Sequence, residues 1–196
     1  MPLHAQRYYP IIEYINKFYC ENILEIGVCK GDTSIEMLNY SKNKNVKYYG
    51  VDLFEDMEEH VFKNEVSIPA NTMSEVESFL KSVSQNVKLF KGFSNKIFDE
   101  VKALNIKFDL IFIDGGHSYE TVKSDFENYS ELLNDNGIIF FDDYTEEPGF
   151  GIKQYVDELS KNKNFLVMII ESDKYTDLYR GYKFQTAVVR KRKNDE

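Results

Sequence analysis

The 196-residue chain has little cysteine and no long apolar run. Its two cysteines, Cys20 and Cys29, are too few for a disulfide scaffold and lack a CxxC spacing, so free thiols are expected. No apolar stretch reaches the roughly 18 residues that a membrane-spanning helix needs, and the amino terminus lacks the order of a secretion signal. These absences predict a cytoplasmic protein with no membrane partner.

Clustered positive charge is also scarce. The formal net charge is −9, and the one basic run, at residues 190–193, is interpreted as a solvated tail. Because a protein needs a clustered basic face to neutralise a nucleic-acid backbone, nucleic acid is excluded as a partner. What the chain does have is apolar: 42% hydrophobic and 15% aromatic residues can build a full core. We therefore expect one domain over residues 1–196.

Hydrophobic periodicity alternates between strand and helix along the chain. Strands are predicted at 22–26, 46–51, 87–90, 108–113, 138–141, 165–170 and 185–190. Helices are predicted within 1–20, at 33–39, at about 95–104, through Phe126 to Leu133, and at 152–159. A further helix is predicted to start at Ser74, where Ser74 and Glu77 have the spacing of a capping box. This alternation predicts an α/β fold, a doubly wound and mostly parallel sheet with helices on both faces. The last two strands have no helix between them, which predicts an antiparallel edge. The acid-rich segment 54–71 is predicted to form a loop or short helices, as a lid or a plain surface insertion.

The first candidate site is the turn after strand 22–26. Glu25, Gly27 and Gly31 form ExGxxxG rather than the GxGxxG of dinucleotide-binding turns. An acid there repels phosphate but can bind a cationic amino group, and a generic strand-to-helix turn stays equally open. Asp52 ends the next strand, where a carboxylate can accept hydrogen bonds from both ribose hydroxyls of a nucleoside, or cap the following segment. Ser94, after Gly92, either contacts an adenine or caps the helix that follows.

A second candidate site joins two neighbouring strands. Asp114 and His117 follow the apolar run 108–113, and Asp142 and Asp143 follow 138–141. Clustered carboxylates repel one another unless a cation or proton intervenes, so a hard divalent ion, Mg²⁺ before Ca²⁺ or Mn²⁺, is favoured over separate capping roles. His117 is either a surface histidine or a base that takes a proton from a hydroxyl whose acidity the metal increases.

At these residues the chain resembles the class I S-adenosylmethionine-dependent methyltransferases. LEIGVCKGDT (residues 24–33) resembles their motif I, YYGVDLF (48–54) their ribose-binding acid, and LFKGFS (89–94) their adenine-side loop. The stretch FIDGGHSYETVKSDFENYSELLNDNGIIFFDDY (112–144) is similar to the branch that contains macrocin O-methyltransferase and related sugar O-methyltransferases. The resemblance implies a Rossmann-like, seven-stranded sheet of order 3-2-1-4-5-7-6, with strand 7 antiparallel.

The resemblance also implies a set of site residues. The implied cofactor-binding residues are Glu25, Gly27, Gly31, Thr33, Asp52, Leu53, Gly92, Ser94, Asp114 and Gly115. The implied metal ligands are Asp114, Asp142 and Asp143. The implied catalytic residues are His117, as the base, and Asp114. Where relatives of the macrolide-sugar type carry Glu-Asp, this chain has Asp142-Asp143, with a first side chain one methylene shorter.

The implied activity is O-methylation of a hydroxyl on a small, sugar-like or polyol acceptor, with S-adenosylmethionine and Mg²⁺ or another divalent cation. One alternative is a metal-independent methyltransferase. A second is a non-haem iron hydroxylase like the cephalosporin hydroxylases, which would need a second histidine ligand near Asp114, and neither His4 nor His60 is an obvious candidate. A non-catalytic binding subunit with the same fold is a third. A monomer and a homodimer both stay open.

Overall fold

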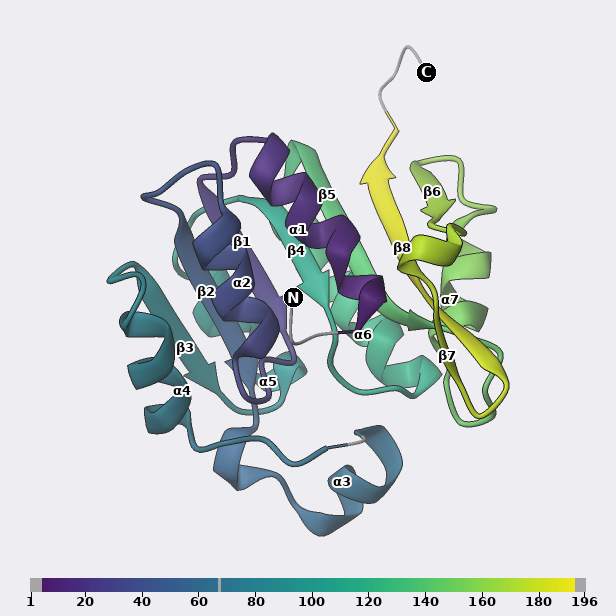
Figure 1. Cartoon of the computed structure of the whole chain (residues 1–196), viewed down its shortest axis with the longest axis horizontal. Helices are drawn as coiled ribbons and strands as arrows, with labels where there is room; N and C mark the ends of the chain where they lie inside the picture. Colours follow the sequence, from purple (N-terminus) through teal and green to yellow (C-terminus); the bar gives the residue numbers. More distant parts are fainter. Residues whose placement is uncertain (1–4, 67, 193–196) are drawn as a thin grey trace.

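The fold is known from a computed structural model that describes residues 5–66 and 68–192. In this part of the chain one sheet contains eight strands in the order β3-β2-β1-β4-β5-β8-β6, with β7 paired to β8 (Figure 1). The strands are β1 Asn22–Ile26, β2 Lys47–Asp52, β3 Val87–Lys91, β4 Phe108–Ile113, β5 Leu133–Tyr144, β6 Phe165–Ile169, β7 Asp177–Tyr179 and β8 Tyr182–Lys191. Strands β1 to β5 are mutually parallel, and β8 is antiparallel to β5, β6 and β7.

This topology confirms the predicted Rossmann-like fold and its strand order. The strand expected as the seventh is β8, antiparallel between β5 and β6. The short strand β7 was not predicted, because three residues are too few to show alternation. It forms a hairpin with β8 that projects beyond the sheet (Figure 1).

Helices cover both faces of the sheet (Figure 1). They are α1 Tyr9–Lys17, α2 Asp32–Tyr40, α3 Glu59–Glu65, α4 Met73–Lys81, α5 Ser94–Lys102, α6 Tyr119–Tyr129 and α7 Ile152–Leu159, with short 3₁₀ turns η1 Gln6–Tyr8, η2 Phe54–Asp56, η3 Ser130–Leu132 and η4 Asp173–Tyr175. One buried cluster joins α1, α2 and α4 to the sheet, and a second joins α5, α6 and α7.

Strand β4 shows why the central strands are apolar throughout. Its residues alternate between the two buried clusters: Leu110 and Phe112 belong to the α1 side, and Ile111 and Ile113 to the α6 side. Because both faces are covered, neither set meets water, and burying a side chain of this size stabilises the fold by about 1.5–3 kcal/mol. The strand ends at Ile113, and the polar residue Asp114 follows directly.

Two local predictions were wrong. The capping box of α4 is formed by Thr72 and Glu75, which exchange hydrogen bonds of 3.3 and 2.9 Å, while Glu77 pairs with Lys81 inside the helix. Two overlapping registers of the same spacing made this choice ambiguous. Helix α6 ends at Tyr129, so Leu132 lies in η3 and Leu133 begins β5.

Segment 54–71 forms η2, α3 and connecting loops, as expected. Figure 1 places α3 beyond the carboxyl ends of the parallel strands. Residue 67 of this segment, the first four residues of segment 1–20 and residues 193–196 lie outside the described structure. In the residues described, every helix is too short or too polar to cross a membrane.

Candidate active site

Two cavities lie at the carboxyl edge of the parallel strands. The larger, about 820 Å³, is lined from both site regions and includes Glu25, Gly27, Thr33, Asp114, His117 and Asp143. The smaller, about 110 Å³, is lined by Gly27, Asp52, Leu53, Gly92, Ser94 and Gly115 among others. Gly27 borders both. The structure therefore brings most of the predicted site residues to one edge, while Gly31 serves as the N-cap of α2.

The turn after β1 is shaped by glycine and held by Asp52. Gly27 has φ +93°, and a Cβ there would lie 2.0 Å from the Asp114 carbonyl oxygen, so no other residue fits. One oxygen of the Asp52 carboxylate accepts hydrogen bonds from the backbone N–H groups of Val28 (2.8 Å) and Cys29 (2.7 Å). The other accepts from the N–H of Phe54 (2.7 Å), which is the capping contact weighed as an alternative. Asp52 thus fixes the backbone that the cofactor would meet.

Glu25 lines the larger cavity but is almost fully shielded from solvent. Its side chain is buried, and one carboxylate oxygen accepts hydrogen bonds from the hydroxyls of Ser34 (2.5 Å) and Tyr48. Burial raises the pKa of Glu25 to about 7, against the lowering effect of these two hydrogen bonds. Glu25 still borders the larger cavity, so binding of a cationic amino group stays a prediction.

The adenine-side loop contains a residue that was not predicted. Helix α5 begins at Ser94, and in the described structure its N-cap, Phe93, makes no side-chain capping bond, so the capping role for Ser94 was wrong. Ser94 instead donates to Asp125 Oδ1 (2.5 Å). The other oxygen, Asp125 Oδ2, is buried without a hydrogen-bond partner among the described residues, and Asp125 lines the smaller cavity. A carboxyl on the apolar face of α6, beside Val122 and Phe126, was the signal available in the sequence.

That unpartnered oxygen provides a test of whether the site fits a nucleoside cofactor. A buried acceptor is costly to leave unsatisfied, so Asp125 Oδ2 calls for a donor from the cavity. The exocyclic amine of an adenine is such a donor. The residues present fit an adenosyl group in the smaller cavity.

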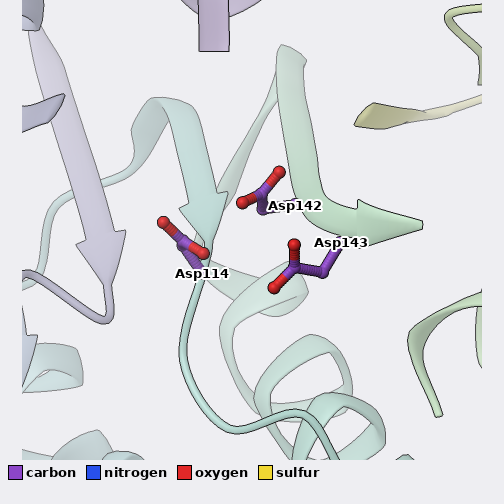
Figure 2. A group of neighbouring side chains, drawn as sticks. All are labelled: Asp114, Asp142 and Asp143. Atoms are coloured by element: carbon purple, nitrogen blue, oxygen red, sulfur yellow. The ribbon is translucent and has the colours of Figure 1, made fainter. Parts of the chain in front are cut away.

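The three predicted metal ligands are close together, as Figure 2 shows. Asp114 follows β4 and Asp142 and Asp143 lie in β5, and one oxygen from each lies within 4.8 Å of the others. Successive strand residues normally point to opposite faces. Here the pairing of β5 with β8 shifts register between Phe141 and Tyr144, and Asp143 has φ +53°, so both carboxylates reach one site. Burial, and then repulsion from Asp142 and Asp143, raises the pKa of Asp114 well above its usual range.

Arg7, which was not predicted, contacts this acidic cluster. Its Nε donates to both oxygens of Asp142 (2.8 and 2.9 Å), and its guanidinium lies 3.2 Å from Asp143 Oδ1 without the geometry of a hydrogen bond. The hydroxyl of Tyr8 donates to Asp114 Oδ2 (3.3 Å). Three close carboxylates, one with a buried oxygen lacking a hydrogen-bond donor in the described structure, fit a hard divalent cation in chemistry and spacing. Arg7 supplies a positive charge in contact with Asp142 and Asp143.

His117 is oriented by three contacts. Its Nε2 lies 3.2 Å from Asp143 Oδ2, and its ring stacks on Phe150 with centroids 4.4 Å apart. Its backbone N–H donates to the Glu65 carbonyl (3.0 Å), at the end of α3. When Asp143 accepts the Nε2 proton, Nδ1 carries the lone pair that can take a second proton. The arrangement of base and orienting carboxylate is that of a general acid–base site.

An iron hydroxylase would need a second histidine ligand near Asp114. His60, on α3, has a side chain 68% exposed and lies 3.4 Å from Glu58. His4 lies outside the described residues. Among the residues described, the group with metal-like spacing consists of the three aspartates.

Comparison with known proteins then gives the family. The family described as "Methyltransferase domain" matches residues 24–144. This range holds both cavities' predicted cofactor residues and the whole acidic cluster. The match establishes that the chain belongs to this methyltransferase-domain family, and the sheet order above is the Rossmann-like order expected for it.

The individual relatives are distant. An uncharacterized protein of Acanthamoeba polyphaga mimivirus, R132, is 29% identical over 164 residues, covering 83% of this chain and 64% of that protein. The chain thus spans less than two thirds of this relative's length. Among solved structures, the O-methyltransferase TomG from Streptomyces achromogenes, in complex with S-adenosylmethionine, superposes with a TM-score of 0.71 at 14% identity, covering 97% of this chain and 82% of that one. The methyltransferase MycE of the mycinamycin pathway, in complex with Mg, S-adenosylhomocysteine and mycinamycin VI, gives 0.56 at 18% identity, covering 96% and 49%.

Proposed function

We propose that this protein transfers the methyl group of S-adenosylmethionine to a hydroxyl oxygen of a small, sugar-like or polyol molecule in the cytoplasm. The observation that carries the proposal is the His117–Asp143 pair, 3.2 Å apart, at the wall of a cavity that also borders the cofactor turn. At about 820 Å³ this cavity is within the range of small-molecule sites. The MycE complex, which contains mycinamycin VI, supports a small-molecule acceptor.

The cofactor would be held along the edge from the smaller to the larger cavity. The glycine turn at Gly27 allows close approach of its backbone, and Asp52 and Asp125 offer acceptors for ribose hydroxyls and an adenine amine. Glu25 and Thr33 border the larger cavity, where the amino acid part of the cofactor would lie.

The chemistry then follows from charge. The acceptor oxygen attacks the sulfonium methyl carbon, the new C–O bond forms as the C–S bond breaks, and the sulfur leaves as a neutral thioether. His117 accepts the hydroxyl proton, and Asp143 stabilises the imidazolium that results. A divalent cation bound by Asp114, Asp142 and Asp143 would increase the acidity of the acceptor hydroxyl. Phe150, stacked on the imidazole, keeps the ring in place.

A metal-independent methyltransferase is the second candidate, and a specific observation favours it. Arg7 already supplies a positive charge to Asp142 and Asp143. In that case the same residues act without a divalent ion, and His117 remains the base.

The experiment that tests the proposal has two stages. Calorimetry measures S-adenosylhomocysteine binding in Mg²⁺ and in EDTA, and an S-adenosylhomocysteine release assay then screens sugars and polyols under both conditions. We expect saturable cofactor binding in both media and acceptor-dependent release. Activity that survives EDTA selects the metal-independent candidate, and a protein that binds no cofactor refutes the proposal.

A further inference from the structure

Arg7 bridges the acidic cluster and the β7–β8 hairpin. Its Nε donates to Asp142, its Nη2 lies 3.2 Å from Asp143, and its Nη1 lies 3.3 Å from Asp177, the first residue of β7. The Asp142 side chain is 1% exposed and that of Arg7 is 18% exposed. Because Asp142 is shielded from water, leaving its carboxylate without a cation would be costly.

Arg7 uses the same atoms that a divalent cation would use. Both carboxylate oxygens of Asp142 accept from Arg7, and the Asp143 oxygen that lacks a hydrogen-bond donor in the described structure is the one nearest the guanidinium. A metal bound to these oxygens at about 2.1 Å would lie next to the guanidinium. Two like charges at such a separation, in a site shielded from water, repel strongly.

The backbone around Arg7 is anchored independently of its side chain. The N–H groups of Gln6 and Arg7 donate to the two oxygens of Asp177, each at 3.1 Å, and the Thr186 hydroxyl donates to the Arg7 carbonyl (2.5 Å). The guanidinium also lies 4.9 Å from the ring centre of Tyr8 and 5.7 Å from that of Phe184. Arg7 therefore has other partners if it leaves Asp142, and it can do so without releasing the segment.

We propose that the Arg7 guanidinium and a divalent cation are mutually exclusive occupants of the Asp142–Asp143 site, with Arg7 as the resident cation whenever the metal is absent. The inference rests on the proposed function only in treating this cluster as the place where a cation acts. Metal binding then depends on competition between the divalent cation and Arg7 for the carboxylates of Asp142 and Asp143. Weakening Arg7 should increase metal affinity, and metal binding should displace Arg7.

The first test is Mn²⁺ binding to the full chain, followed by electron paramagnetic resonance. Arg7→Gln should bind Mn²⁺ about tenfold more tightly than the unchanged protein, because a positive charge leaves the site. Arg180→Gln is the matched control, since Arg180 lines the same cavity but pairs with Glu147, and it should change affinity by less than about twofold. Adding Asp142→Asn to Arg7→Gln should abolish the gain. Equal or weaker Mn²⁺ binding by Arg7→Gln overturns the inference.

A second test measures metal binding in the unchanged protein and uses a variant only to assign the signal. The Nε–H of Arg7 should give a protected nitrogen–proton NMR signal, assigned by its loss in Arg7→Lys. Titration with Mg²⁺ should remove that signal in proportion to the metal bound. Mg²⁺ binding with the signal retained overturns the inference, as does the failure of both metals to bind any of the proteins. Neither result bears on methyl transfer, which the S-adenosylhomocysteine release assay measures separately in EDTA.

Discussion

The proposed cofactor side and the proposed acceptor side of the strand edge are built by different means. On the cofactor side, Asp52 accepts three backbone N–H groups and Gly27 lets two backbones touch, so main-chain contacts fix the shape. On the acceptor side, the shape depends on side-chain charges, because Arg7 pairs with both Asp142 and Asp143. A site fixed by backbone can bind one constant cofactor, whereas a site fixed by side-chain charges can be altered by single substitutions or by a bound ion.

The largest effect that separates the two sides is expected for His117→Ala. Loss of a positioned base should lower kcat by about 10²–10⁴-fold. Because His117 contacts Asp143 and Phe150 rather than the smaller cavity, S-adenosylhomocysteine affinity should stay within about threefold. Initial rates of S-adenosylhomocysteine formation and calorimetry measure the two quantities.

His60→Ala is the control for this substitution, since it removes an exposed imidazole on α3. It should keep full activity. An active His117→Ala enzyme would remove His117 from the mechanism, and a His117→Ala enzyme that lost cofactor affinity as well would show that the two sides do not act separately.

The buried Asp125 carboxyl makes the stability of the fold depend on pH. Burial raises the pKa of Asp125 from 3.8 to about 7, despite the lowering effect of the Ser94 hydrogen bond. The folded protein therefore holds a proton that the unfolded chain releases near its ordinary pKa. This contribution to stability is fully present below about pH 4 and is lost as the pH rises through about 7.

Asp125→Asn should remove that dependence. Between pH 5 and pH 8 the free energy of unfolding of the unchanged protein should fall by about 3 kcal/mol more than that of the variant. Urea unfolding at the two pH values, without cofactor, measures the difference. Asp99→Asn, on the exposed face of α5, should follow the unchanged protein. Parallel curves for Asp125→Asn and the unchanged protein would show that Asp125 is ionised in the fold at both pH values.

The same contrast explains what the sequence could predict. Gly27 and Asp52 carry local signals, since a glycine after a buried strand and an acid at a strand end are visible within a few residues. Asp114, Asp142 and Asp143 were predicted to meet because parallel neighbouring strands end at one edge, and the structure places them within 4.8 Å. Their roles in binding and catalysis stay predictions.

The residues that were missed are joined by contacts that leave no local pattern. Arg7 and Asp142 are 135 positions apart, and Glu65 and Ser118 are 53 apart. A lone arginine near an N-terminal helix has no spacing that reveals its partner. Asp125 was the exception, because a carboxyl within the apolar stripe of Val122, Phe126 and Tyr129 is visible in the sequence.

The smallest effect is expected at the junction of the two sides, where Glu65 ends α3. Its carboxylate accepts the Ser118 N–H (3.0 Å), its carbonyl accepts the His117 N–H (3.0 Å), and the residue lines the smaller cavity. Glu65→Gln keeps an acceptor but loses the charge, which weakens one hydrogen bond by about 1 kcal/mol.

Because that bond ties segment 54–71 to the loop that carries His117, kcat and cofactor affinity should both fall, each by up to about fivefold. Glu59→Gln is the matched control on the same helix, where the side chain is 79% exposed and pairs with Lys63, and it should change neither quantity. A loss in kcat alone would assign Glu65 to the acceptor side, and a loss in affinity alone to the cofactor side. Only a loss in both would show that α3 couples a backbone-built half of the site to a charge-built one.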